Sequence, residues 1–217
     1  MAQFETNSRS SFYGFPKHYY EHKYPSIGSS ALASQLATLL TEEGIKSKSV
    51  KRGLDHGVFA SFSILFPPSS TNALFPNIPL VQISLPSPTS PDSSRYISLG
   101  RALSTLRSQG VVIICSGMAV HNLRDLFSNP DPSKPLNYAI TFDEALRSAV
   151  EDGGVEERAE RMGLLLQRKD AKRAHPSWDH LWPVFVAAGA GEGDAGKRIW
   201  TLVEGSMSWG MFRFGGV

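Results

Sequence analysis

Four of the six histidines in this chain stand in local sequences that could carry chemistry. They are His56, His121, and the pair His175 and His180. Imidazole is the commonest ligand for transition metals in proteins, and it is the side chain whose unperturbed pKa lets it exchange protons near neutral pH. These four positions therefore indicate metal binding, acid–base catalysis or both.

His121 has the most informative position of the four. It follows the apolar run at residues 110–115, which is typical of a buried strand, through a Ser116-Gly117 turn. In an open α/β sheet, ligands bind beyond the carboxyl ends of the strands, so a polar residue at this place favours function. The alternative is a structural histidine at the start of a helix that begins near Asn122.

The other three histidines leave more alternatives open. His56 lies in a glycine-flanked loop beside Asp55, but neighbouring side chains in an extended segment point to opposite faces, so Asp55 need not orient it. His175 and His180 stand on either side of Pro176, which can open a helix running through Leu181. Because the pair is five residues apart, it does not share one helix face, and we expect at most one metal ligand from it.

The elements that must position these residues alternate between strands and helices. The predicted strands span residues 58–66, 80–85 and 110–115, and the predicted helices span residues 29–43, 96–109 and 142–151. This order predicts an α/β fold. We expect a single domain over residues 1–217, with a central, mostly parallel or mixed sheet flanked by helices on both faces.

Composition excludes several classes of function. The 22 Lys and Arg residues nearly balance the 20 Asp and Glu residues, and no basic block is long enough to follow a phosphate backbone, so nucleic acid is not an expected partner. A single cysteine, Cys115, rules out an internal disulfide and favours a reducing compartment. No apolar run is long enough to cross a bilayer and the first residues do not form a signal peptide, so we expect a cytoplasmic protein without membrane contact.

Six short motifs give the sequence a more specific character. In chain order the motifs are Phe12-Tyr13-Gly14-Phe15-Pro16, Tyr24-Pro25-Ser26-Ile27-Gly28-Ser29, Arg52-Gly53-Leu54-Asp55-His56-Gly57, Val81-Gln82-Ile83-Ser84-Leu85, Ser116-Gly117-Met118-Ala119-Val120-His121-Asn122-Leu123-Arg124 and Ala174-His175-Pro176-Ser177-Trp178-Asp179-His180. Together, and over nearly the whole chain, they resemble the class III extradiol ring-cleavage dioxygenases of the DOPA 4,5-dioxygenase type.

The resemblance implies a reaction and a set of residues. Members of this family use non-haem Fe(II), or Zn(II) as found in some of them, to open a catechol ring with incorporation of both atoms of O2. By motif, His180 matches a metal ligand. His121 matches the histidine at the metal centre that serves as acid–base group or additional ligand, and His56 matches a catalytic histidine that contacts substrate or dioxygen. His175 is less constant in the family pattern and would at most lie outside the metal ligands, next to one of them.

Two family features differ near the start of this sequence. The first strand and its His-Gly-Ser-Pro loop have no counterpart here, and the family segment Ala-His-Trp-Glu reads Ala2-Gln3-Phe4-Glu5. A truncated gene model, an alternative start and a degenerate paralogue explain this equally well. A sheet without its first strand would expose a neighbouring edge, which makes a homodimer a candidate assembly.

The sequence therefore predicts a metal-dependent extradiol dioxygenase acting on a catecholic aromatic compound and O2. The alternative is a catalytically impaired paralogue or fragment that binds an aromatic ligand without turnover.

Overall fold

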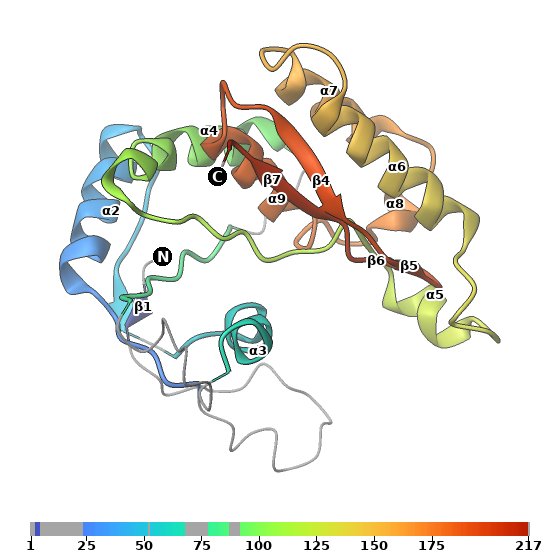
Figure 1. The fold of residues 1–217 in the computed structure, drawn as a ribbon, viewed down its shortest axis with the longest axis horizontal. Coiled ribbons are helices and arrows are strands. Elements are labelled where there is room, and N and C mark those ends of the chain that lie inside the picture. Colours follow the sequence, from blue (N-terminus) through green and yellow to red (C-terminus); the bar gives the residue numbers. More distant parts are fainter. Residues whose placement is uncertain (1–2, 5–23, 52, 68–77, 87–91, 217) are drawn as a thin grey trace. The chain divides into compact units, whose positions relative to one another are not determined.

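A computed structural model describes residues 3–4, 24–51, 53–67, 78–86 and 92–216 (Figure 1). The chain divides into two compact units, Met1–Leu85 and Pro86–Val217. No helix among the described residues is both long and apolar enough to cross a membrane.

The described residues of the first unit form two helices and one pair of short strands. These elements are β1 (Gln3–Phe4), α2 (Ser30–Glu42), β2 (Val50–Lys51) and α3 (His56–Leu65). The hydroxyl of Ser29 accepts a hydrogen bond from the Leu32 amide and caps α2, which confirms the helix predicted at residues 29–43. β1 and β2 pair in parallel.

The strand predicted at residues 58–66 is wrong, because this segment forms α3. Phe59 and Phe62 are three residues apart and both are buried, and they pack with Tyr24 and Leu54 in one apolar cluster. A spacing of three residues places side chains on the same face of a helix but on opposite faces of a strand. The short apolar run concealed this helical spacing.

The strands predicted at residues 80–85 and 110–115 are also wrong, since neither segment is assigned to a strand. Strand structure requires a paired neighbour, and no strand pairing involves either segment in the part of the chain that the structure describes. In the second segment Val112 is 81% exposed and Ile114 is 53% exposed. Both segments are rich in apolar, branched residues, which is the composition typical of strands. Composition alone does not provide the neighbouring strand with which a strand must pair.

The second unit holds most of the regular structure. Its elements are α4 (Ser93–Ser104), η1 (Arg107–Gln109), β3 (Val120–His121), α5 (Leu123–Ser128), α6 (Asn137–Glu151), α7 (Arg158–Leu164), η2 (Leu165–Gln167), α8 (Ala171–Ala174), α9 (Trp182–Ala190), β4 (Gly196–Trp200), β5 (Val203–Glu204), β6 (Met207–Ser208) and β7 (Met211–Phe214). The helix predicted at residues 96–109 appears as α4 followed by η1, and the helix at residues 142–151 forms the later turns of α6.

The helices α4 and α9 pack with their backbones unusually close together. A Cβ atom built on Gly100 would lie 2.1 Å from the Val186 carbonyl oxygen, and one on Gly189 would lie 2.2 Å from the Ile97 carbonyl oxygen. The two backbones can approach this closely only because both residues are glycine. The rings of Tyr96 and Trp182 stack across the same interface, with their centroids 4.3 Å apart.

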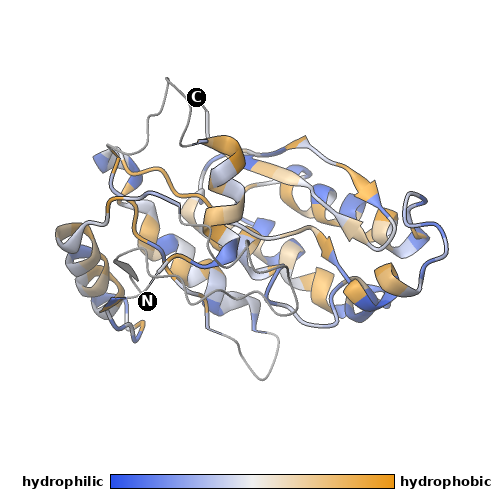
Figure 2. Ribbon diagram, turned by 90° about the horizontal axis from the view of Figure 1, so that it is seen from below, coloured by the Kyte–Doolittle hydropathy of each residue, from blue (hydrophilic) through white to orange (hydrophobic). Residues whose placement is uncertain are grey.

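The strands of the second unit are short and antiparallel. β3, β6 and β5 form one sheet in that order, and β4 pairs with β7. α6 contacts both β4 and β6, and Figure 1 shows it running beside the paired strands β4 and β7. The helices carry alternating bands of hydrophobic and hydrophilic residues (Figure 2), as expected where one face is buried. The fold is therefore mixed α/β as predicted, but the central parallel sheet is not confirmed.

Candidate functional site

His121 is held at the end of a short strand. It is the second residue of β3, which pairs with β6 through Val120 opposite Ser208 and His121 opposite Met207. Val120 is fully buried, so the alternation of side chains along a strand turns His121 to the other face, where it is half-buried. The next residue, Asn122, accepts a hydrogen bond from the Asp125 amide and caps α5. The strand and the helix cap together fix the backbone on both sides of His121.

His180 lies in the loop that precedes α9. Its carbonyl oxygen accepts a hydrogen bond of 2.8 Å from the Met118 amide. A Cβ atom on Gly117 would lie 2.4 Å from the same carbonyl oxygen, so this close approach requires a glycine. α9 begins at Trp182 with a proline in its first turn, which is Pro183; the prediction that Pro176 opens this helix is wrong.

These two backbone positions bring two imidazole rings together. The rings of His121 and His180 stack with centroids 3.6 Å apart and an angle of 11° between their planes. Nδ1 of His180 lies 2.9 Å from Oδ2 of Asp179. A carboxylate at Nδ1 is a common second partner of a metal-binding histidine and would leave Nε2 for a metal ion.

The electrostatic environment keeps His121 uncharged near neutral pH. Burial, together with the neighbouring His180, lowers the pKa of His121 to about 4. The close contact with the His180 ring holds the pKa of Asp179 well below its usual range. A neutral imidazole beside an ionised carboxylate can offer a lone pair to a metal ion or accept a proton from a substrate hydroxyl.

His175 lies at the buried side of this pair. It is fully buried, and its Nε2 atom lies 2.9 Å from the Ala119 carbonyl oxygen. Burial lowers the pKa of His175 to about 4. Its ring packs edge-to-face with Phe142 and lies roughly parallel to the ring of Trp178. Because a carbonyl oxygen only accepts hydrogen bonds, Nε2 of His175 must be the donor.

The remaining predicted residue, His56, belongs to the first unit. It is the first residue of α3 and is exposed. The carboxylate of the preceding Asp55 accepts a hydrogen bond from Gln82, and the Asp55 amide donates to the Gln82 side chain. Gln82 is buried and therefore fixes the loop before His56.

The imidazole side chains of His121 and His180 are of a chemical type that binds transition metals. Imidazole suits iron and zinc, and His121 and His180 lie next to each other. No group of three or more His, Cys, Asp or Glu side chains able to hold a metal ion occurs among the residues that the structure describes. Gln3 is described only as part of β1, and Glu5 lies outside the described residues.

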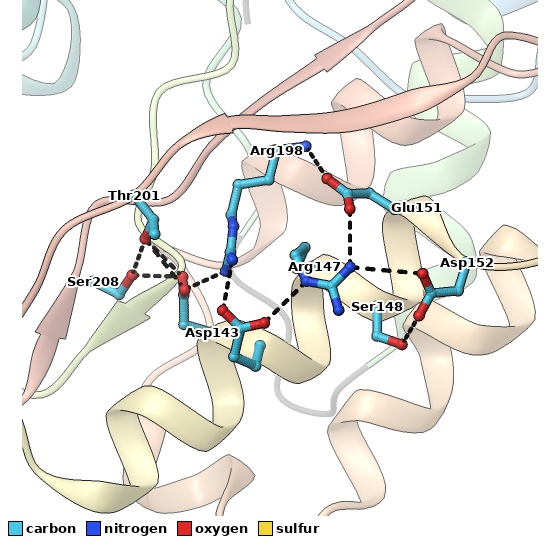
Figure 3. Close-up of polar contacts among 9 residues, drawn as sticks. Asp143, Arg147, Ser148, Glu151, Asp152, Arg198, Thr201 and Ser208 are labelled. Atoms are coloured by element: carbon cyan, nitrogen blue, oxygen red, sulfur yellow. Dashed lines mark hydrogen bonds and ion pairs between the residues drawn. The ribbon is translucent and has the colours of Figure 1, made fainter.

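Sequence reasoning missed a network of polar residues around Asp143 that joins α6 to β4 and β6 (Figure 3). Asp143 of α6 is 1% exposed and accepts hydrogen bonds of 2.6 Å from both Ser208 of β6 and Arg198 of β4. Thr201 donates to the same carboxylate. A usable signal existed, because Asp143 precedes Leu146 by three residues and so lies on the apolar face of α6.

Comparison with known proteins identifies the family. Residues 2–209 match the family described as the catalytic LigB subunit of aromatic ring-opening dioxygenase. The chain belongs to this family.

Curated relatives agree with this membership. The chain is 34% identical over 207 residues to a 4,5-DOPA dioxygenase extradiol of Beta vulgaris, which covers 94% of this chain and 72% of the relative. It is 31% identical over 195 residues to the protein of the same name from Escherichia coli strain K12, covering 89% of this chain and 67% of that protein. A 4,5-DOPA dioxygenase extradiol-like protein of Schizosaccharomyces pombe is 32% identical over 193 residues, but only 61% of its length is covered.

A solved structure supports the same relationship. The uncharacterized protein JW3007 of Escherichia coli K12 superposes with a TM-score of 0.74 at 29% sequence identity, over 90% of this chain and 77% of that one. The LigB family and its relatives confirm the family predicted from the six motifs. The roles of His56, His121 and His180 stay predictions.

Proposed function

We propose that this chain is a metal-dependent extradiol dioxygenase that opens the ring of a catecholic aromatic compound with incorporation of O2. The observation that supports this most directly is the stacked pair His121 and His180, placed side by side in a chain of the ring-opening dioxygenase family. The names of the relatives, which include 4,5-DOPA dioxygenase extradiol, support a catechol as the substrate class.

We propose Fe(II) as the resident metal, with Zn(II) as the ion that the same imidazoles would also accept. A divalent metal with open positions would hold a catecholate and dioxygen side by side. His180 would bind this metal through the nitrogen that does not face Asp179. The neutral state of His121 suits either of its two proposed roles, as a further ligand or as the group that accepts a proton from the substrate hydroxyl.

The test measures metal and turnover separately. The purified chain is loaded anaerobically with Fe(II), freed of excess metal and assayed for iron content and for oxygen uptake with catechol and with DOPA. We expect close to one iron per chain and oxygen uptake in the wild type. His180→Ala should retain no stoichiometric iron.

The two roles of His121 give different results in the same assay. If His121 is a ligand, His121→Ala loses iron as His180→Ala does. If it is the acid–base group, His121→Ala keeps iron and loses about 100-fold or more in turnover. His56→Ala should keep iron and lose turnover. Full iron content and full oxygen uptake in all three variants would refute the site.

The second candidate function is binding of an aromatic ligand without turnover. It is favoured by Gln3, which stands where the family segment Ala-His-Trp-Glu has its histidine. This alternative predicts that the wild type binds catechol, seen in equilibrium dialysis, without oxygen uptake after Fe(II) loading.

A homodimer is also part of the proposal. Light scattering of the purified chain measures the mass of the assembly directly.

A further inference from the structure

The segments that carry His121 and His180 are joined by three hydrogen bonds in an antiparallel order. The Met118 amide donates to the His180 carbonyl oxygen at 2.8 Å. The His175 side chain reaches the Ala119 carbonyl oxygen at 2.9 Å. The Asn122 side chain donates to the Arg173 carbonyl oxygen at 2.8 Å. Only the first of these bonds is a backbone pair, so two buried side chains replace the ladder that two strands would form.

Ala119 is held on both sides of its backbone. Its amide donates to the Ser208 carbonyl oxygen at 3.1 Å, which continues the pairing of β3 with β6. Its carbonyl oxygen faces the other way and receives Nε2 of His175. His175 therefore connects the loop before His180 to the start of β3, two residues before His121.

Packing alone does not explain a histidine at position 175. The side chain is fully buried between Phe142 and Trp178, where an aromatic hydrocarbon ring would fill the space without carrying polar atoms. Nδ1 of His175 has no hydrogen-bond partner among the described residues. A buried nitrogen without a partner costs stability, so the hydrogen bond from Nε2 to Ala119 is the feature that favours histidine here.

We propose that His175 is a positioning residue: its hydrogen bond to Ala119 sets the placement of His121 against His180. This inference rests on the proposed function in that the stacked pair is taken as part of the metal site. His175 touches neither metal nor substrate and acts through the backbone of β3. Partners that orient metal-binding groups in this way typically change metal affinity by about 10- to 100-fold when they are removed.

The test uses variants of His175 that differ in whether a side-chain N–H group can reach the Ala119 carbonyl oxygen. In His175→Gln the amide nitrogen stands about as far along the side chain as Nε2 of histidine, so the bond to Ala119 can form. In His175→Asn the amide is too short to reach. His175→Phe keeps the ring volume without any donor. Phe142→Leu is the matched control, because it loosens the same cluster and leaves the hydrogen bond intact.

Two readouts are measured on the full chain, with thermal melting as the check of folding. The first is the nuclear Overhauser effect between the ring protons of His121 and His180 in the metal-free protein. The second is Co(II) affinity by anaerobic titration. We expect the wild type, His175→Gln and Phe142→Leu to keep the ring contact and to bind Co(II) within about threefold of one another. His175→Asn and His175→Phe should lose the ring contact and about 10- to 100-fold in affinity.

The two readouts separate the positioning role from the proposed function. If the wild type does not bind Co(II), the metal site fails, and the ring contact in the metal-free variants still decides the role of His175. If Phe142→Leu loses the ring contact as His175→Asn does, or if His175→Asn keeps it, His175 is a packing residue and the inference is overturned. If His175→Phe does not fold, the comparison of Gln with Asn still decides between the two.

Discussion

At the scale of single residues, the buried carboxylate of Asp143 is the clearest determinant of stability near the candidate site. It is 1% exposed and receives Arg198 and Ser208, whereas the neighbouring Glu144 is half-exposed and meets the same arginine at 2.5 Å. Both acids pair with the guanidinium of Arg198, but only Asp143 is buried, where it also accepts hydrogen bonds from Ser208 and Thr201. Alanine variants of the two acids therefore compare a buried with an exposed partner of the same arginine.

We predict that Asp143→Ala lowers the free energy of unfolding by about 3 kcal/mol, because it leaves Arg198 and Ser208 without their buried acceptor. Glu144→Ala should cost at most about 1 kcal/mol, since its ion pair is open to solvent. Urea denaturation followed by circular dichroism measures both. Equal losses in the two variants would contradict the role assigned to burial.

The buried imidazole of His175 makes stability depend on pH. Its pKa is about 4 in the folded chain and near the ordinary value of about 6.5 in the unfolded chain. Between these values the unfolded chain takes up the proton first, so the free energy of unfolding falls as the pH falls. At pH 5 the contribution of this one group should be lower than at pH 7 by about 2 kcal/mol.

His175→Gln removes that titration, so its stability should fall less between pH 7 and pH 5 than that of the wild type. The lowered carboxylate pKa values near the site, such as that of Asp179, act only at lower pH and do not enter this interval. An unchanged slope in His175→Gln would show that His175 is protonated alike in both states.

At the scale of elements, helices were predicted more successfully than strands. The helices at residues 29–43 and 142–151 could be predicted because leucines and other apolar residues recur on one face, and a serine cap marks the first start. The three predicted strands failed because strand structure depends on partners that are distant in the sequence. The candidate histidines could be singled out from their motifs, whereas the partners of Asp143, which are Arg198 and Ser208, follow only from the fold.

The packing of α4 on α9 leads to a prediction about two glycines. Gly100→Ala would force a Cβ atom against backbone atoms of α9, and we expect a loss of at least about 3 kcal/mol. Gly163 of α7 meets only the Ser93 hydroxyl at an ordinary contact distance of 3.4 Å. Gly163→Ala should therefore raise stability by about 0.5 kcal/mol, because alanine is the better helix former. Thermal melting of both variants measures the contrast, and similar shifts would refute close backbone packing.

At the scale of the whole molecule, the single domain over residues 1–217 stays a prediction, and the two compact units offer a way to measure it. All four tryptophans lie in the second unit, at positions 178, 182, 200 and 209. Tryptophan fluorescence therefore reports on that unit, whereas far-ultraviolet circular dichroism reports on helices of both. We expect the two unfolding curves to coincide, as they do for one cooperative domain. Two separate midpoints would show that the units unfold independently.

Family membership and the stacked histidines both support the central proposal, which is that the chain opens a catechol ring with O2. The most direct measurement is the mass of the product formed by the Fe(II)-loaded chain from catechol under ¹⁸O2. We predict a ring-opened product that carries two labelled oxygen atoms. A product without label, or a catechol recovered with its ring intact from iron-loaded protein, would contradict the account.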